Sequence, residues 1–539
     1  MGLSNLFIFD SLSLFVGGFV LFFTAVIFIY SLGFIRENRL NYYLWFFLTA
    51  AVSLGVVLSR RIELVIIFWG FLGLTFFQMI NLSSDDKAAA TAKKAFIIIG
   101  ASDAFMLLGF LLYFHLTSNV FIDGSSLVIN DRLSLLAFLL VAAGCFAKAG
   151  CMPFHTWIPD VAQRASLPVV AYLPASVDKL LGIYLLVRIV KDTFVLDTTA
   201  RVILLVCGAL TVIFAVMMAL VQHNIKKLLG YHAVSQVGYM VLGIGCGSVL
   251  GLAAGLLHML NHAIYKSCLF LGAGNVETRT ASDELDDLGG LAKFMPITFI
   301  ATVIAAFSIS GIPPFNGFVS KWMVYQALVD YLKTADSAGL KIVISLSLIM
   351  ALIGSGLTLA SFLKLLSGVF LGKAKREVKE VGFLLYFPLL VLAFLCIIFG
   401  LFFNSTARRF IEASLGEVHI GGLWQPGSAM ALIVLGLIIG WVIYKLSAAK
   451  IRLSSSYVGG ETIDDNLPVG DFYSNIKDMP FLKKIYLMAE EKSFDLYEQG
   501  KKGVFFISGI LRFLHNGILP TYLAWCLLGI LGLFFVFLR

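Results

Sequence analysis

Residues 14–34 read LFVGGFVLFFTAVIFIYSLGF, an uninterrupted apolar segment that is long enough to cross a bilayer as a helix. Its apolar residues do not alternate with polar ones, as the strands of a membrane barrel would require. About fourteen such runs can be separated along the 539 residues. They lie at approximately 11–34, 41–58, 62–81, 94–115, 132–150, 168–190, 201–222, 229–247, 250–273, 295–333, 341–371, 383–403, 428–447 and 519–538. The sequence therefore predicts an all-α polytopic membrane protein with about 14 transmembrane helices.

The composition excludes a soluble globular domain. Hydrophobic residues make up 59% of the chain and charged residues only 13%, and 48 residues are Phe. The net charge of +8 is scattered over short loops and forms no basic domain with interleaved aromatic residues. We interpret this charge as a topology signal, and no nucleic acid is expected as a partner.

The cysteines give no ligand set for zinc or an iron–sulfur cluster. There are seven, none in a CxxC pair, and the nearest two are Cys145 and Cys151. No cofactor is therefore expected in this chain, and any redox chemistry must belong to a partner. The first apolar run follows no basic segment and precedes no small-residue cleavage site, so we expect a retained span and not a signal peptide.

Two sites should interrupt helices inside the membrane. Gly150 with Pro153, and Gly311 with the pair Pro313 and Pro314, share the pattern G-x-x-P-F. Proline removes a backbone donor and clashes with the preceding turn, so each site predicts a broken helix. Broken helices in corresponding halves are typical of inverted-repeat transporters, although an ordinary proline kink is the alternative.

The loop charges predict an orientation. The Lys and Arg residues near 36–39, 87–94, 226–227 and 373–379 outnumber those of the other loops if these four share a side, and that side should be cytoplasmic. The polar stretch 448–518 falls on the same side. Within it, Phe481, Leu482, Ile485 and Met488 recur at helical spacing, which favours an amphipathic surface helix, and a partly ordered linker is the alternative.

Ionisable groups inside apolar runs are costly, so each one suggests a function. His258, His262 and Lys266 follow at i, i+4 and i+8, which places them on one helical face. A lysine without water around it releases its proton more readily, so a file of such groups predicts a proton path. Some lysines could instead extend to the interface, Lys227 and Lys364 above all, and Lys266 if its helix ended nearby. The candidate ion-translocation residues are Lys148, Lys179, Lys266, Lys321, His258, His262 and Asp103.

Five segments together resemble one known family, the antiporter-like proton-translocating subunits shared by respiratory complex I, energy-converting membrane-bound hydrogenases and multisubunit Na⁺/H⁺ antiporters. The likeness covers roughly residues 5–400 in consistent order. The segments are KAGCMPFHTWIPD (148–160), PVVAYLPASVDK (168–179), HNIKKLLGY with SQVGY (223–239), NHAIYKSCLFLGAG (261–274) and GIPPFNGFVSK (311–321).

The resemblance implies two inverted five-helix repeats, each with a broken helix, around a hydrophilic axis at the membrane midplane. By position, Lys148 is similar to the family's lysine at the first break and Lys179 to its follower. Lys266 is similar to the central lysine, and Lys321 to the terminal one at the second break. The expected organisation is N-terminal helices in 1–93, a first repeat in 94–222 broken near 148–160, a second repeat in 223–371 broken near 310–321, C-terminal helices in 372–447, the cytoplasmic loop 448–518 and a last helix in 519–539.

The resemblance also suggests partners and a location. The segment after residue 514 resembles the tail of hydrogenase-type subunits, which implies peripheral iron–sulfur or hydrogenase-like subunits in a prokaryotic cytoplasmic membrane. The first apolar run, with Asp10, resembles the family's third helix, so a small neighbouring subunit is expected to supply two missing N-terminal helices. Other membrane subunits and lipid complete the expected partners.

One departure from the family pattern concerns a carboxylate. Where the family has Trp-Glu, this chain has Trp69-Gly70, so Lys148 lacks its usual counter-charge. Asp103 lies in the next apolar run, and we predict that it comes within salt-bridge or single-water reach of Lys148. Glu63 lies about 10 Å from position 70 along the same helix, which is too far for strong coupling.

Three functions fit these observations. The first is a subunit that moves H⁺ or Na⁺ in a redox-driven complex. The second is a Na⁺/H⁺ antiporter module without electron transfer. The third is a non-conducting scaffold, which the Gly70 departure keeps open.

Overall fold

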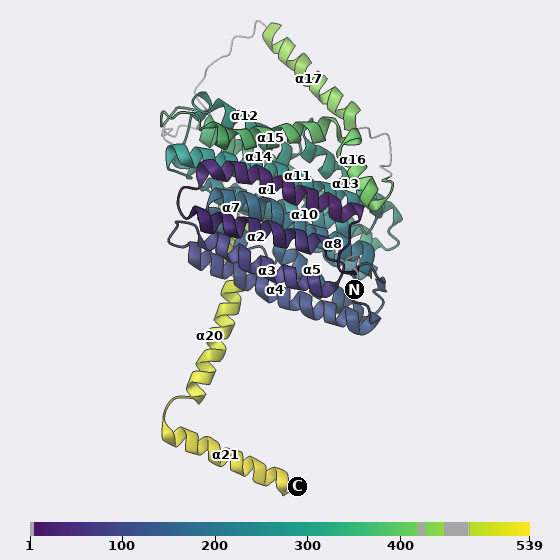
Figure 1. Cartoon of the computed structure of the whole chain (residues 1–539), viewed down its shortest axis with the longest axis vertical. Helices are drawn as coiled ribbons and strands as arrows, with labels where there is room; N and C mark the ends of the chain where they lie inside the picture. Colours follow the sequence, from purple (N-terminus) through teal and green to yellow (C-terminus); the bar gives the residue numbers. More distant parts are fainter. Residues whose placement is uncertain (1–4, 419–425, 447–472, 474, 539) are drawn as a thin grey trace. The chain divides into compact units, whose positions relative to one another are not determined.

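The computed structural model describes residues 5–418, 426–446, 473 and 475–538 of the chain. The chain divides into two compact units, Met1–Leu482 and Lys483–Arg539. The first unit is a bundle of long helices that run roughly parallel or antiparallel to one another (Figure 1). The prediction of an all-α polytopic membrane protein is confirmed, because ten described helices are long and apolar enough to cross a bilayer.

The helices up to the second break follow the predicted apolar runs closely. They are α1 (Ser11–Phe34), α2 (Arg39–Leu58), α3 (Ile62–Asn81), α4 (Ala88–Thr117), α5 (Arg132–Ala149), α6 (Trp157–Arg164), α7 (Leu167–Tyr172), the π-helical turn η2 (Leu173–Val177), α8 (Asp178–Arg188), the π-helical turn η3 (Ile189–Thr193), α9 (Thr198–Leu220), α10 (Ile225–Gly245), α11 (Val249–Thr280) and α12 (Pro296–Ser310).

The remaining described elements are mostly helical too. They are the 3₁₀ turns η4 (Leu285–Asp287), η5 (Leu291–Lys293) and η6 (Phe403–Ser405), the helices α13 (Asn316–Thr334), α14 (Ala338–Phe370), α15 (Phe383–Leu401), α16 (Ala407–Leu415), α17 (Pro426–Leu446), α18 (Asn475–Asp478), α19 (Pro480–Glu490), α20 (Leu496–Leu514) and α21 (Leu519–Phe537), and the two short strands β1 (Leu127–Val128) and β2 (Phe194–Val195).

Fewer helices meet the criteria of an apolar span than the fourteen expected runs. The predicted run 295–333 is divided between α12 and α13. Helices α10, α11 and α13 are not among the ten candidate spans. Each carries buried polar or ionisable side chains toward the interior of the bundle, which lowers its mean hydropathy although it lies in the core.

Both predicted interruptions end a helix. Helix α5 ends at Ala149 before Gly150, whose φ is +81°, and α12 ends at Ser310 before Gly311, whose φ is +79°. Such a left-handed conformation strains residues that carry a Cβ atom, so glycine suits both positions. The helix resumes only after the proline that follows each glycine. The division of the bundle into two inverted repeats stays a prediction.

The basic loops that were predicted to share a side do gather at one end of the first unit. Lys94 pairs with Asp160, and Lys226 pairs with both Glu277 and Asp283. Arg376 donates a hydrogen bond to the carbonyl of Thr280, at the end of α11 near Glu277, and Arg36 and Arg279 line one pocket there. The cytoplasmic location of this end stays a prediction. At the opposite end, β1 and β2 form a short parallel pair that the sequence analysis did not predict.

The expectation that Lys364 extends to the interface was wrong. Its side chain is buried, and its Nζ donates a hydrogen bond of 3.0 Å to the carbonyl of Leu220 at the end of α9. Lys266 does not reach an interface either, because α11 continues for fourteen residues beyond it and the side chain is fully buried.

The polar stretch 448–518 is only partly within the described residues. Residues 447–472 lie outside them, and so does that part of the predicted loop. The predicted amphipathic segment around Phe481 to Met488 falls within α19. Helix α20 was not predicted, because its nineteen residues were expected to belong to the loop.

Candidate ion pathway

Four lysines form the framework of the candidate site. Lys148, Lys179 and Lys266 are fully buried, and Lys321 is 2% exposed. Helices α5, α8, α11 and α13 contribute one each. Within the described part of the chain, no Nζ atom of these four lysines has a hydrogen-bond partner. Buried polar atoms without partners are rare in proteins and commonly mark a function or bound water.

Lys148 occupies the last turn of α5, directly before the first break. Its Nζ lies 5.2 Å from the centre of the Trp69 ring, and Trp69 Nε1 donates a hydrogen bond of 2.8 Å to Asp103. Trp69 therefore contacts both groups. Among the described residues, Asp103 and Lys148 form no ion pair, although the charge of Lys148 acts on the carboxylate. The predicted salt bridge does not form, and Trp69 contacts both groups instead. The predicted contact through a single water molecule stays a prediction.

Gly70 does not face Lys148. A Cβ atom built on Gly70 would meet no other atom within 4 Å, and the residue lies on the outer surface of the unit, whereas Trp69 is fully buried. Consecutive helical residues point about 100° apart, so only one of the two can face the interior. A glutamate at position 70 would project outward in this chain. Glu63 is not available either, because it pairs with Arg61 at 2.7 Å.

One carboxylate that was not predicted from the sequence lies in the interior. Asp178 is the first residue of α8, is fully buried, and has no hydrogen-bond partner for either oxygen among the described residues. The charges of Lys148 and Lys179 both act on it. The available signal was an Asp-Lys pair within the apolar run 168–190, of which only the lysine was singled out.

Lys179 lies against the first break. A Cβ atom on Gly150 would come within 3.1 Å of Lys179 Nζ and 1.8 Å of Ile158, so the break needs glycine for space as well as for backbone conformation. The lysine Nζ also lies 5.7 Å from the Trp157 ring, which adds a cation–π contact. The π-helical turn η2 directly precedes Asp178 and Lys179, and π turns often occur at functional sites.

The centre of the pathway is built on α11. Lys266 Nζ lies 5.4 Å from the Phe270 ring and 5.7 Å from the Phe362 ring. His262 is fully buried, and neither ring nitrogen has a hydrogen-bond partner among the described residues. The charges of Lys179 and Lys266 both act on His262, which links the first break to the centre.

A further histidine, His232 on α10, was not predicted to belong to the site. Its Nε2 lies 2.8 Å from Ser361 Oγ on α14, and its ring lies 4.8 Å from that of Phe362. The charges of Lys266 and Lys321 both act on it. Phe362 lies against both His232 and Lys266.

The second break holds Lys321 and His258. Lys321 Nζ lies 4.6 Å from the Tyr239 ring, and His258 Nδ1 lies 2.9 Å from Ser320 Oγ, next to Lys321 in the chain. Reciprocal hydrogen bonds between Asn261 and the Asn316 amide and carbonyl groups fasten α11 to the first residue of α13. Of the three predicted residues on α11, His258 lies at the second break, whereas His262 and Lys266 lie at the centre.

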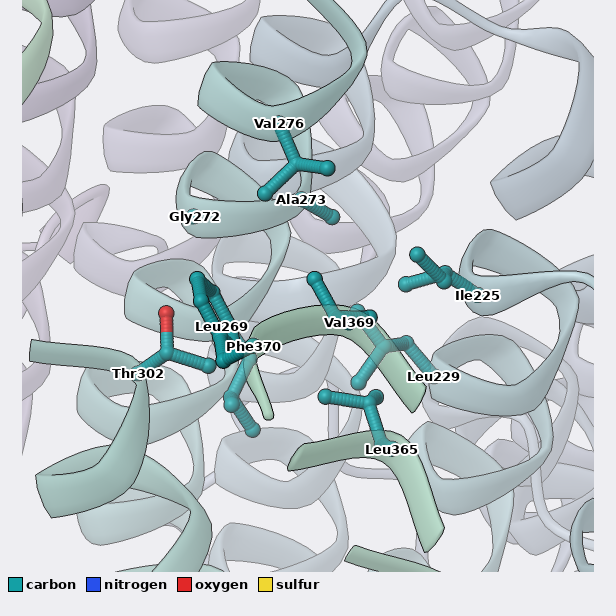
Figure 2. A pocket seen from close by; sticks show the side chains of 10 residues that line it. All are labelled: Ile225, Leu229, Leu269, Gly272, Ala273, Val276, Thr302, Leu365, Val369 and Phe370. Carbon is teal, nitrogen blue, oxygen red and sulfur yellow. The ribbon is translucent and has the colours of Figure 1, made fainter. Parts of the chain in front are cut away.

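The pathway differs from a substrate pocket or metal centre. Among the described residues, no group of three or more His, Cys, Asp or Glu side chains could hold a metal ion. Figure 2 shows a pocket between α10, α11, α12 and α14, where Thr302 supplies the only oxygen drawn among otherwise apolar side chains. Its volume of about 10 Å³ is at the lower limit of the space that one water molecule needs.

Solved structures of known proteins share this fold. The Mrp complex from Dietzia sp. DQ12-45-1b has a chain with a TM-score of 0.78 and 23% identity, which covers 98% of this chain and 55% of that one. The membrane-bound sulfane sulfur reductase, an archaeal respiratory membrane complex, gives a TM-score of 0.76 with 25% identity over 97% of this chain and 88% of that one. A chain of respiratory complex I from Thermus thermophilus gives a TM-score of 0.62 with 22% identity, and the likeness covers 74% of this chain and 86% of that one.

Sequence relatives point to the same group. The Na(+)/H(+) antiporter subunit A1 of Staphylococcus epidermidis is 30% identical over 417 residues, which is 72% of this chain and 51% of the relative. The subunit A1 of Staphylococcus haemolyticus is 30% identical over 413 residues. The chain spans about half the length of the curated relatives it matches.

The family comparison covers both breaks and all four lysines. Residues 59–344, more than half of the chain, match the model described as NADH:quinone oxidoreductase/Mrp antiporter, TM. The structural likenesses and the sequence relatives agree with this match. The chain belongs to the NADH:quinone oxidoreductase/Mrp antiporter transmembrane family.

Proposed function

We propose that this chain is the proton-translocating subunit of a redox-driven membrane complex and carries protons along its buried lysines and histidines. The supporting observation is the set of buried protonatable side chains in the interior. Protonatable groups from five helices, among them Lys148, Lys179, Lys266 and Lys321, are buried in the interior of the first unit. No enzymatic group is needed in the chain, because redox chemistry would reside in partner subunits.

The chemistry of the file suits stepwise transfer. A lysine in an apolar surrounding loses the solvation that stabilises its ammonium form, so its charged and neutral forms become close in free energy. His262 and His232 lie between consecutive lysines and can accept a proton on one nitrogen while they release one from the other. Water would complete the connections, because the four lysine Nζ atoms, His232 Nδ1 and both ring nitrogens of His262 have no hydrogen-bond partner among the described residues.

The assignment to a redox-driven complex rests on how much of each chain the structural likeness covers. The chain of the sulfane sulfur reductase complex matches this chain over most of both lengths, whereas the Mrp chain is matched over only 55% of its own. Other membrane subunits are the proposed partners of this chain. We place the complex in a prokaryotic cytoplasmic membrane, with the basic loops inside.

A Na⁺/H⁺ antiporter module is the second candidate, and a specific observation favours it. The curated relatives are named as Na(+)/H(+) antiporter subunits. The scaffold alternative depended on the loss of a carboxylate at Gly70. It loses that support, because position 70 faces outward and Asp178 lies inside.

Purification of the intact complex distinguishes the two candidates. A redox-driven complex should retain iron–sulfur subunits and acidify or alkalinise vesicles when an electron donor is added. An antiporter module should contain no iron–sulfur subunit and should move protons only against a Na⁺ gradient. Na⁺-driven exchange without electron transfer would overturn the redox part of the proposal.

Lys266→Ala tests ion translocation in either case. Because Lys266 is the central link, we expect proton transport by the complex in vesicles to fall by about tenfold or more while assembly is unchanged. Lys293→Ala, at an exposed lysine of η5, is the matched control and should transport like the wild type. Wild-type transport in a fully assembled Lys266→Ala complex would remove the proposed pathway.

A further inference from the structure

Asp178 is the charged group of the interior that most needs an explanation. Its carboxylate is fully buried, and neither oxygen has a hydrogen-bond partner among the described residues. A carboxylate in that state is among the costliest groups to hold inside a membrane protein, and such groups usually occur where a nearby cation offsets the cost. Lys148 and Lys179 are the two cations whose charges act on it.

The packing of α8 against α5 directs Asp178 toward Lys148. A Cβ atom on Gly182 would come within 2.7 Å of the Ala149 backbone nitrogen and 2.9 Å of the Cys145 carbonyl oxygen, so the two helices touch there. Asp178 precedes Gly182 by four residues and therefore lies on the same face of α8. Lys148 follows Cys145 by three residues and lies on the α5 face that meets it.

The other carboxylates near the first break are already engaged or face elsewhere. Asp103 accepts the indole hydrogen bond of Trp69, and Glu63 pairs with Arg61. The remaining titratable group that Asp178 acts on is the Tyr172 hydroxyl of α7, which hydrogen-bonds Thr24 at 3.0 Å. Asp178 is thus the carboxylate available to both lysines.

We propose that Asp178 is the counter-charge of the first half of the pathway and is shared between Lys148 and Lys179. This inference rests on the proposed proton-translocating function. The trio holds one mobile proton: an N–H bond of the Lys148 ammonium breaks, an N–H bond forms on the neutral amine of Lys179, and Asp178 stays ionised. The carboxylate stabilises whichever lysine carries the proton, so the trio keeps a net charge of zero throughout the step.

The test compares Asp178→Asn with Asp178→Glu in the intact complex. The Asn variant keeps the shape and removes the charge, so proton transport in vesicles should fall by about tenfold or more. The Glu variant keeps the charge and should retain most of the transport. Asp330→Asn, at a surface carboxylate of α13 paired with Lys333, is the control for a charge removed outside the pathway.

Two results would overturn the inference. One is wild-type transport in Asp178→Asn. The other is an equal loss in the Asn and Glu variants, which would mean that shape and not charge is required. If Asp178→Asn does not assemble, the double variant Lys148→Met/Asp178→Asn removes opposite charges together and should assemble. Failure of that double variant to assemble would also contradict the charge pairing.

Lys266→Ala in the same vesicles separates this inference from the proposed function. Loss of transport in Lys266→Ala together with wild-type transport in Asp178→Asn would leave the pathway in place and remove the role of Asp178. Wild-type transport in Lys266→Ala would remove the pathway itself.

Discussion

Single residues decide which charges can meet in the interior of this protein. Trp69 and Gly70 are neighbours in the sequence, yet one is fully buried and the other lies on the outer surface of its unit. The departure from the family pattern at Gly70 therefore does not leave a gap beside Lys148. The interior carboxylate is supplied from α8, by Asp178, which suggests that the position of the counter-charge is less constrained than its presence.

We predict that a glutamate at position 70 cannot replace Asp178. The double variant Gly70→Glu/Asp178→Asn should transport protons as slowly as Asp178→Asn, because residue 70 projects away from Lys148. Gly70→Ala is the control and should behave like the wild type, since a Cβ atom there meets nothing within 4 Å. Restored transport in the double variant would show that position 70 faces the pathway.

At the scale of single residues, the sequence identified the lysines but not their partners. A charge inside an apolar run is visible without a structure, and this made Lys148, Lys179, Lys266 and Lys321 candidates. Asp178 and His232 were missed because their roles depend on packing. His232, for example, lies within hydrogen-bond distance of Ser361, 129 residues away along the chain.

For helices, the ends could be predicted from the sequence, but burial could not always be. The helix breaks at Gly150 and Gly311 could be predicted because glycine and proline act locally on the backbone. Helix α10 illustrates the converse, since it lies in the core although its hydropathy is below that of a membrane span. What surrounds a helix, and not its own composition, determines whether it is buried.

One element-scale contact ties the end of α8 to the start of α1. Arg188, 1% exposed, donates two hydrogen bonds to Asp10 and one to Asp192. Asp10 also caps α1 by accepting from the backbone nitrogen of Ser13. Although burial raises it, the hydrogen bond and charge of Arg188 hold the pKa of Asp10 well below its usual range.

Arg188→Met should lower the stability of the protein by about 2 kcal/mol, because it leaves Asp10 without its cationic partner and Asp192 with only Lys191, both carboxylates being partly exposed to solvent. The thermal midpoint of the purified complex measures this. Arg60→Met is the control, since its pair with Asp123 is more exposed and should contribute at most about 1 kcal/mol. Equal shifts in the two variants would contradict the account.

The same contact has a pH dependence whose direction follows from Asp10. A carboxyl group with a lowered pKa in the folded protein contributes its full stabilisation above the unfolded pKa and loses it as the pH falls. The difference between wild type and Arg188→Met should therefore be complete above pH 3.8, the usual pKa of Asp10, and shrink below it. A difference that grew with acidification would have the wrong sign.

For the whole molecule, the pathway explains the placement of the polar residues in a chain that is 59% hydrophobic. The four lysines come from four helices, and all four are buried in the interior of the first unit. The sequence predicted the membrane fold from the lengths of the apolar runs. It could not order the charged groups along one file, since their order is set by contacts between distant segments.

The most direct test of the proposed proton pathway compares proton transport by two variants of the complex, Lys321→Met and Lys333→Met. Both lysines lie on α13, but Lys321 is 2% exposed and the side chain of Lys333 is 68% exposed. Measured in vesicles with a pH-sensitive dye, Lys321→Met should lose transport by about tenfold or more and Lys333→Met should transport normally. Full transport by an assembled Lys321→Met complex would contradict the claim that protons travel along the buried lysines.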